Sequence, residues 1–295
     1  MKKNKTIIMV LLFFMGLLVL LYPTLSDLYN QKVQSAAIAS YESILKNYEE
    51  KDYSKLFASA YSYNEKLKSL SDPYLTHDKL KNYNQIMNLD GNGMMGYISI
   101  DKIKVELPIY HGTSEKVINV AVGHLKGSSF PVGGVGTHSV LSTHRGLPST
   151  KLFTDLDKLE IGDTFSVTIL NQKLTYQVDH IEIVEPHDIK NLKIDPKKDY
   201  LTLMTCTPYG INTHRLLVRG KRIENEEKPI YITTEAFRVN TMTVTSLVSL
   251  PIIFILLLYI IFKPIENNNK YNEIEKYIFP SKTKKEQEVR KWKEI

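Results

Sequence analysis

The chain has 295 residues, with 38 basic and 32 acidic side chains, a formal charge of +6 and a single cysteine. This length is sufficient for one or two globular domains with a substantial core. A single cysteine excludes an internal disulfide framework and any metal site built from cysteines alone.

Two uncharged runs predict membrane spans. The 21 residues Thr6–Ser26 would cover about 31 Å as a helix, which is enough to cross a bilayer core. The second run, Val239–Phe262, has 24 residues and includes Pro251, which membrane helices tolerate. A cleaved signal peptide is the alternative for the first run. Its apolar stretch is longer than usual and no small-residue cleavage site follows closely, so we expect an uncleaved anchor.

The excess positive charge lies at the two ends of the chain. Residues 1–26 carry a net charge of +3, and residues 263–295 carry nine basic and six acidic side chains, again +3. The segment 27–238 holds 26 basic and 26 acidic residues, so it predicts no nucleic-acid-binding surface. Basic flanks are typical of cytoplasmic ends. We therefore expect a cell-membrane protein with two spans, both termini in the cytoplasm and the segment between the spans outside.

Hydrophobic periodicity predicts helices over residues 27–70. Apolar side chains recur there every three or four residues, at Val33, Ala37, Tyr41, Ile44, Tyr48, Tyr53, Leu56, Ala60, Tyr63, Leu67 and Leu70. The pattern stops at Asp72, Pro73 and Tyr74, because the residue before a proline is biased away from helical geometry and proline has no N–H to donate. We expect a kinked connector there, followed by a short helical stretch that ends near Met87.

From Gly93 to Tyr231 the pattern changes to short runs rich in β-branched and aromatic residues. The predicted strands are Tyr97–Ile103, Lys104–Tyr110, His138–His144, Thr164–Leu170, Leu174–Val184, Tyr200–Cys206 and His214–Lys221. Strands of this length and spacing favour an antiparallel sandwich or a closed barrel. One helix is expected at Thr150–Leu159.

The expected organisation has five parts. Residues 1–26 form the cytoplasmic N-terminus and the first span, 27–92 the N-terminal helices with their connector, and 93–231 the β domain. Residues 232–262 form a linker and the second span, and 263–295 a polar cytoplasmic tail.

The lone cysteine occupies a position suited to chemistry. Cys206 closes the alternating strand Tyr200–Cys206, and a turn marked by Pro208 and Gly210 follows it. If the next strand pairs back across this turn, Arg215 lies beside Cys206. A thiol next to a fixed cation favours the thiolate, and a guanidinium can donate hydrogen bonds to a developing oxyanion. The alternative is a small buried cysteine beside an ordinary surface arginine.

A cysteine nucleophile needs a partner for proton transfer, usually a histidine. His144 closes one predicted strand and is expected at a strand end, but the residues alone do not select it over His138 or His214. No two histidines have the spacing of a zinc motif. The segment Asp90–Gly93 begins like a calcium loop and then lacks the later ligands. No metal or cofactor site is expected.

Three segments resemble the sortases, the cysteine transpeptidases of Gram-positive cell surfaces, over roughly Gly93–Ile223. The run Thr202–Cys206 reads TLMTC and matches the TLxTC signature, with Arg215 at the family's usual short spacing. The run Ser142–Gly146 resembles the segment that carries the sortase histidine. The second span and the motif Asp72, Pro73, Tyr74 resemble class C, the pilin-polymerising subgroup. That subgroup more often has Trp or Phe where this chain has tyrosine.

The resemblance implies a mainly β fold, a closed sortase-type barrel with N-terminal helices and two flanking transmembrane helices. It implies that Cys206 is the nucleophile, His144 the general acid and base, and Arg215 the residue that positions the substrate and stabilises the oxyanion. It also implies a lid formed by residues 72–74, in which Asp72 would pair with Arg215 and Tyr74 would cover Cys206.

The resemblance further implies cleavage of an LPxTG-like sorting signal between Thr and Gly in a pilin precursor. A lysine of the next pilin would then receive the acyl group as an isopeptide bond, without a metal or organic cofactor. The implied partners are pilin precursors and the membrane. Two alternatives stay open: a housekeeping-type sortase that attaches surface proteins to peptidoglycan, and a non-enzymatic, membrane-tethered β-barrel scaffold.

Overall fold

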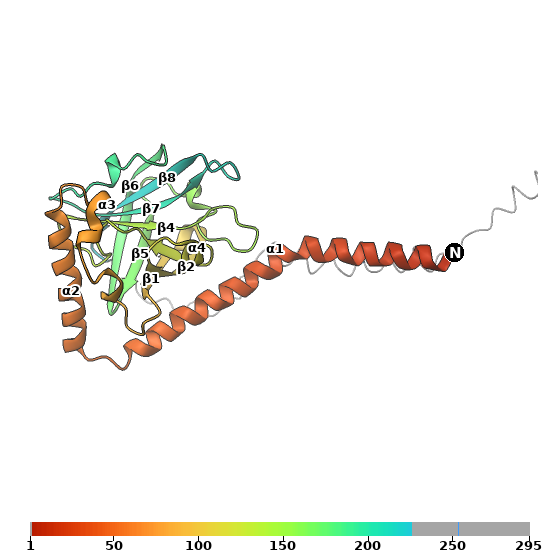
Figure 1. Cartoon of the computed structure of the whole chain (residues 1–295), viewed down its shortest axis with the longest axis horizontal. Helices are drawn as coiled ribbons and strands as arrows, with labels where there is room; N and C mark the ends of the chain where they lie inside the picture. The colour runs from red at the N-terminus through yellow and green to blue at the C-terminus, as the bar shows by residue number, and fades with distance from the viewer. Residues whose placement is uncertain (1, 226–252, 254–295) are drawn as a thin grey trace, which may run out of the picture. The chain divides into compact units, whose positions relative to one another are not determined.

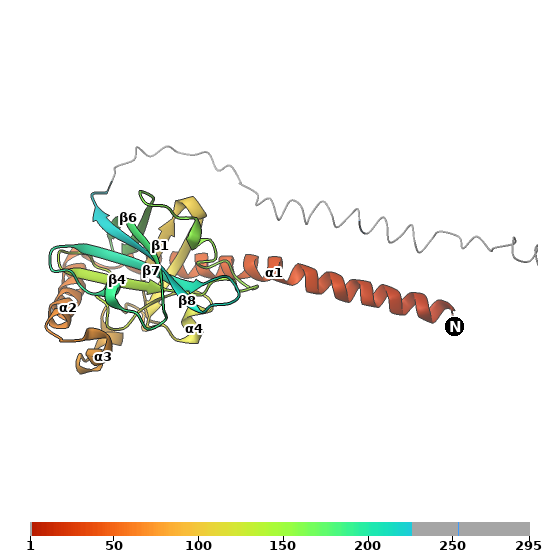
Figure 2. The same ribbon diagram turned by 90° about the horizontal axis from the view of Figure 1, so that it is seen from above.

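The computed structural model describes residues 2–225 and 253. The predicted second span, Val239–Phe262, and the tail 263–295 thus lie outside the described residues, apart from residue 253. The described part of the chain contains a closed β-barrel preceded by helices (Figures 1 and 2). The barrel confirms the fold class, and it decides between the sandwich and the barrel that the strand pattern left open.

The first helix, α1, runs from Lys2 to Leu45 without interruption at Pro23. Its part Val10–Leu45 is, among the described residues, the one helix long and apolar enough to cross a membrane. Leu18 and Leu20 in this part are exposed, as a lipid-facing surface requires. The predicted anchor and the first predicted helix are therefore one continuous helix.

The second helix, α2 (Glu50–Lys68), packs against the barrel. Its buried side chains Phe57, Ala60, Tyr63 and Leu67 recur at helical spacing and join the main hydrophobic core. The predicted helix is confirmed here, and its periodic apolar side chains form the face that packs on the barrel. The C-terminal part of α1 is held in a similar way, because the Tyr41 hydroxyl donates a hydrogen bond of 2.9 Å to the carbonyl of Met95.

The connector after α2 contains three short elements: α3 (Pro73–Thr76) and the 3-10 turns η1 (His77–Lys79) and η2 (Tyr83–Gln85). Pro73 is the first residue of α3, where its missing N–H costs nothing. Asp72 is extended and caps the helix. The predicted kink is therefore a helix start built from Asp72 and Pro73.

The barrel has eight strands: β1 (Met94–Ile100), β2 (Val105–His111), β3 (Val122–His124), β4 (Thr137–Ser142), β5 (Thr164–Ile169), β6 (Gln172–Val184), β7 (Asp199–Thr207) and β8 (His214–Ile223). Their order around the barrel is β1-β2-β3-β4-β7-β8-β6-β5, and β5 pairs with β1 to close it. The pairs β2–β3 and β4–β7 are parallel. The barrel is therefore of mixed strand direction.

Sequence patterns missed or misassigned three elements. Strand β3 and the helix α4 (Glu115–Ile118) were not predicted, because three or four residues are too few to show a period. The helix expected at Thr150–Leu159 is replaced by the 3-10 turn η4 (Leu156–Lys158). Leu152 has a φ of 39°, which a right-handed helix excludes. Two further 3-10 turns, η3 (Asp101–Ile103) and η5 (Lys190–Leu192), complete the fold.

The barrel interior is filled by apolar side chains from successive strands, among them Ile98, Ile109, Leu141, Val167, Leu203 and Val218. On β7 the residues Leu203 and Thr205 are buried, while Met204 and Cys206 are partly exposed. This is the predicted alternation, and it directs the thiol of Cys206 away from the core.

Candidate active site

Strands β7 and β8 place Arg215 directly opposite Cys206. The two residues are register partners in the antiparallel pair, and Thr207 and His214 are the next pair toward the turn. Partners in such a pair project to the same face of the sheet. Cys206 is a free, partly exposed thiol. The structure therefore brings a fixed cation next to a thiol at the rim of the barrel.

The parallel pair β4–β7 brings His144 to the same rim. Its last register partners are Ser142 and Met204, and two hydrogen bonds continue this register. The N–H of Thr143 donates to the carbonyl of Met204 at 3.3 Å, and the hydroxyl of Thr205 donates to the carbonyl of Thr143 at 2.9 Å. Thr143 is thus level with Thr205, and the next residue on each segment places His144 level with Cys206.

Three side chains thus form a row across neighbouring chain segments. His144 follows β4, Cys206 lies in β7 and Arg215 lies in β8. Adjacent strands are about 4.8 Å apart, so Cys206 and Arg215 are direct neighbours, and the continued register places the backbone of His144 beside that of Cys206. Beyond the row the same register continues, because Arg145 Nη1 donates to the Thr207 hydroxyl at 3.4 Å.

An acidic residue faces His144. The Nε2 atom of His144 lies 3.4 Å from Oε2 of Glu115, the first residue of α4. The side chain of His144 is 25% exposed, whereas that of Glu115 is 77% exposed. Glu115 was not predicted as a site residue, because neither α4 nor β3 was predicted.

The two other candidate histidines occupy different environments. His138 is fully buried in β4, where its Nδ1 lies 2.9 Å from the Lys193 carbonyl and its Nε2 lies 2.7 Å from the Thr202 hydroxyl. Burial lowers the pKa of His138 to about 4. His214 is next to Arg215 on β8, so it projects to the opposite face, and its Nε2 lies 3.2 Å from Glu185 Oε1. Of the three candidates, His144 is the one level with the thiol.

Arg215 is held by backbone carbonyls. Its Nη1 donates to the carbonyl of His214 at 3.1 Å and to that of Asn212 at 3.4 Å. The expected ion pair with Asp72 is wrong. The Oδ1 atom of Asp72 instead accepts the backbone N–H groups of Tyr74, at 3.1 Å, and Leu75, at 3.3 Å. The carboxylate is used as the helix cap that the start of α3 requires.

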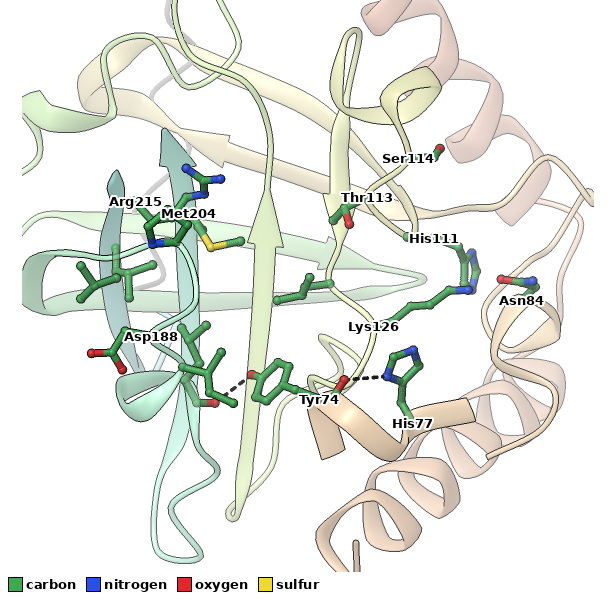
Figure 3. A pocket seen from close by; sticks show the side chains of 17 residues that line it. Tyr74, His77, Asn84, His111, Thr113, Ser114, Lys126, Asp188, Met204 and Arg215 are labelled. Carbon is green, nitrogen blue, oxygen red and sulfur yellow. Dashed lines mark hydrogen bonds between the residues drawn. The ribbon is translucent and has the colours of Figure 1, made fainter. Parts of the chain in front are cut away.

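A cavity of about 610 Å³ leads away from Arg215 and runs past Tyr74 to Lys126 (Figure 3). Met204, two residues before Cys206 on the same face of β7, lines the cavity close to Arg215. Leu125, Ile189, Leu192 and Leu217 also line it. The groove therefore begins at Arg215 and has an apolar floor.

Tyr74 is seated in this groove. Its hydroxyl donates a hydrogen bond of 2.9 Å to the Leu192 carbonyl, and burial raises its pKa above the ordinary value. The lid passes close to Gly127, where a Cβ atom would lie 2.8 Å from Tyr74 Cα and 2.9 Å from the carbonyl oxygen of Pro73. Tyr74 and Met204 pack against the same apolar cluster, so Tyr74 lies in the groove that Arg215 also lines.

A second cavity, of about 380 Å³, lies against the lid and is lined by Lys68, Leu70, Ser71, Asp72, Pro73, Tyr74, Gly127, Ile189, Lys193, Ile194 and Pro196. The lid residues Asp72, Pro73 and Tyr74 are therefore bordered by open space. Within the part of the chain that the structure describes, no group of three or more His, Cys, Asp or Glu side chains could hold a metal ion.

Comparison with known proteins decides the family. The sortase-domain family model matches residues 98–223. The crystal structure of sortase C1 from Streptococcus agalactiae is 51% identical, with a TM-score of 0.60, and the match covers 65% of this chain and 100% of that chain. The chain belongs to the sortase family. Solved class C sortases thus match a larger share of the chain than the family model does.

Two further relatives of this sortase define the range of the similarity. The structure of sortase C1 of GBS Pilus Island 1 is 39% identical, with a TM-score of 0.57, and the match covers 67% of this chain and 95% of that chain. Sortase D of Bacillus subtilis is 32% identical over 131 residues, which are 43% of this chain. This chain spans 63% of the length of that relative.

Proposed function

We propose that this protein is a membrane-anchored cysteine transpeptidase that polymerises pilins. The observation that carries the proposal is the row of His144, Cys206 and Arg215, in which one thiol has a histidine on one side and a guanidinium on the other. This is the arrangement of a nucleophile with an acid–base partner and an oxyanion donor. No metal or organic cofactor is needed for this chemistry.

The first half-reaction breaks one amide bond. The sulfur of Cys206 attacks the threonine carbonyl carbon of an LPxTG-like sorting signal and forms a C–S bond, while the carbonyl π electrons move to the oxygen. Arg215 donates hydrogen bonds to that oxyanion. When the oxyanion collapses, the C–N bond to glycine breaks and His144 gives its proton to the leaving amine. The product is a thioacyl-enzyme.

The second half-reaction forms the new bond. A lysine amine attacks the thioester carbonyl, His144 accepts a proton from that amine, and the Cys206 thiolate leaves. The result is an isopeptide bond between two subunits, and the enzyme returns to its starting state. A pilin lysine is the proposed acceptor because the lid motif is of the class C type and one close relative is encoded in a pilus island.

The lid is proposed to act as a gate. Tyr74 occupies the groove between Lys126 and Arg215, so an extended peptide enters only after the lid moves. The continuous apolar helix α1 is proposed to hold the barrel on the outer face of the membrane, next to sorting signals that are themselves followed by a membrane span. A second span at Val239–Phe262 would bring both termini into the cytoplasm.

Peptide chemistry tests this function. Full-length protein in detergent is incubated with an LPxTG-containing peptide, and the mass of the protein is measured before and after addition of a pilin-derived lysine peptide. We expect an adduct on Cys206 that ends at threonine, followed by its transfer to the lysine peptide. Cys206→Ala is expected to form no adduct. A wild-type protein that binds the peptide without forming an adduct would favour the scaffold alternative.

The acceptor separates the two enzymatic alternatives. Co-expression with matching pilins is expected to yield high-mass ladders with the wild type and none with Cys206→Ala. Transfer to a peptidoglycan amine in preference to the pilin lysine would instead indicate a housekeeping-type sortase.

A further inference from the structure

One end of the large cavity is rich in hydrogen-bond donors and carries a positive charge. In Figure 3 the cavity has Arg215, Met204 and Asp188 on one side of Tyr74, and Lys126, His111, His77 and Asn84 on the other. Thr113 and Ser114 also line the cavity. The end that contains Lys126 is called the basic end below.

Lys126 supplies the charge at the basic end. Its Nζ lies 5.3 Å from the ring centroid of Tyr83, and among the described residues no carboxylate lies within ion-pair distance of it. The acidic residue that follows Ser114 is Glu115, whose carboxylate faces His144 instead. The ammonium of Lys126 is therefore available to a ligand.

The neighbouring histidines are already engaged by other groups. Both ring nitrogens of His111 face backbone carbonyls, of Gly93 at 2.8 Å and of Ile86 at 2.7 Å, and burial lowers its pKa. His77 is engaged by the Tyr74 carbonyl at 3.1 Å and by Asp78 at 3.4 Å. The groups left to bind a ligand beside Lys126 are its own ammonium and the Asn84 amide (Figure 3).

Sheet register gives the distance from the basic end to the thiol. His124 is level with Leu141 on β4, which is level with Leu203 on β7, and the Leu125 N–H continues the pairing by donating to the Val140 carbonyl. Because β3 runs opposite to β7, Lys126 lies about five residues along and two strands across from Cys206. Strand geometry makes this on the order of 20 Å between backbones, or about five residues of extended peptide.

The walls between the two ends are apolar. Leu125, Leu192, Met204 and Leu217 line this stretch, and the Tyr74 ring fills it in the closed state. In a peptide whose scissile carbonyl lies at Cys206, the nearest side chains would contact these apolar walls. A residue four to six positions from the scissile bond would reach the basic end. The charge and donors there fit a carboxylate better than an amine, because a second cation would be repelled by Lys126.

We propose that the basic end is a subsite for a carboxylate side chain of the polypeptide substrate. The carboxylate belongs to an Asp or Glu four to six residues from the threonine whose carbonyl meets Cys206. It accepts hydrogen bonds from the Lys126 ammonium and the Asn84 amide. This inference rests on the proposed function, because it assumes that a polypeptide is bound at Cys206.

The test is a positional scan read out by binding. Fluorescent peptides contain one LPxTG-like signal and one Glu, moved from two to eight residues away on either side of the threonine, each with a Gln counterpart. Their affinity is measured on full-length Cys206→Ala in detergent. We expect Glu to bind about two- to fivefold more tightly than Gln in the four-to-six-residue window, the range measured for solvent-exposed charge pairs.

Matched variants assign the preference to Lys126. Lys126→Gln is expected to remove the Glu preference and Lys126→Arg to retain it. Lys173→Gln, which removes an exposed lysine at the start of β6 outside the cavity lining, is expected to leave it unchanged. Equal affinity for Glu and Gln peptides at every position would overturn the subsite, as would a preference that survives Lys126→Gln, or no peptide binding at all.

A parallel measurement separates this inference from the proposed function. Formation of the Cys206 adduct is followed with the Gln peptides on protein that keeps its thiol. Adduct formation without any Glu preference supports the transpeptidase and rejects the subsite. A Lys126-dependent Glu preference without an adduct supports the subsite and rejects the proposed chemistry.

Discussion

Thr205 fixes the separation of the two chain segments that carry the proposed nucleophile and its acid–base partner. Its buried hydroxyl donates to the Thr143 carbonyl at 2.9 Å, one residue before Cys206 and one residue before His144. A small movement between these segments would change the distance over which a proton must pass. The hydrogen bond of Thr205 therefore contributes to stability and also positions His144 relative to Cys206.

We predict that Thr205→Val slows thioacylation of Cys206 and lowers the free energy of unfolding by about 1–2 kcal/mol, because the Thr143 carbonyl loses its buried partner. The matched control is Thr202→Val, on the same strand, which leaves His138 Nε2 without its partner at the other end of β4. Both variants are expected to lose similar stability in denaturant unfolding. Single-turnover thioacylation should be slower for Thr205→Val alone, and equal rates would refute this positioning role.

Among the site residues, the sequence alone predicted the two that are joined by a short turn. Cys206 and Arg215 are nine residues apart, and hairpin logic is enough to place them side by side. His144 and Cys206 are 62 residues apart and meet through the parallel pair β4–β7. No local pattern encodes a parallel pairing over such a separation. The family resemblance, rather than the spacing, selected His144.

The proposed lid is an element whose stability depends on a helix cap. Asp72 accepts two backbone N–H groups at the start of α3, and its carboxylate does not pair with Arg215. The closed position is further held by the hydrogen bond from the Tyr74 hydroxyl to the Leu192 carbonyl. Opening the lid therefore requires loss of the Asp72 cap or of the hydrogen bond between Tyr74 and Leu192. It does not require an ion pair to break.

Two substitutions at Asp72 distinguish a cap from an ion pair. Asparagine caps helices about as well as aspartate, whereas alanine costs about 1 kcal/mol. We predict that Asp72→Ala raises the rate of Cys206 alkylation about fivefold, while Asp72→Asn leaves it near the wild-type rate. The rate is measured with a bulky maleimide on full-length protein, and Tyr74→Ala serves as the open reference. Equal acceleration by Asp72→Asn and Asp72→Ala would show that charge, rather than capping, keeps the lid closed.

Among the elements, those with a visible period or a strong breaker were predictable. Pro73 predicted the break after α2, and the alternation in β7 predicted that the Cys206 side chain points away from the core. Elements of three or four residues, β3 and α4, show neither signal. Because Glu115 begins α4 and Lys126 follows β3, the acidic neighbour of His144 and the basic end of the cavity were invisible to the sequence.

For the whole molecule, hydropathy and periodicity predicted the order of apolar helix, packed helix and β domain, since each depends on many residues. Barrel closure depends on which strands pair, and here two of the pairs are parallel. Closure of the barrel also buries polar side chains on the paired strands. His124 on β3 and His138 on β4 are both fully buried, and burial lowers the pKa of each to about 4.

These two histidines predict a loss of stability in acid. In the unfolded chain a histidine titrates near 6.5, so between pH 6.5 and 4 the unfolded state binds more protons than the folded state. The free energy of unfolding therefore falls as the pH falls through this window, by up to about 3 kcal/mol for each histidine. Above pH 7 both side chains are neutral in either state and contribute no slope.

Denaturant unfolding of the full-length protein in detergent at pH 7, 6, 5 and 4 measures this slope. His138→Gln provides the control, since an amide can donate to the Lys193 carbonyl and accept from the Thr202 hydroxyl but does not titrate. The variant is expected to be less stable than the wild type at pH 7 and to lose less stability on acidification. Subtracting the two curves cancels every other titrating group, so parallel curves would mean that His138 is not held neutral by the closed barrel.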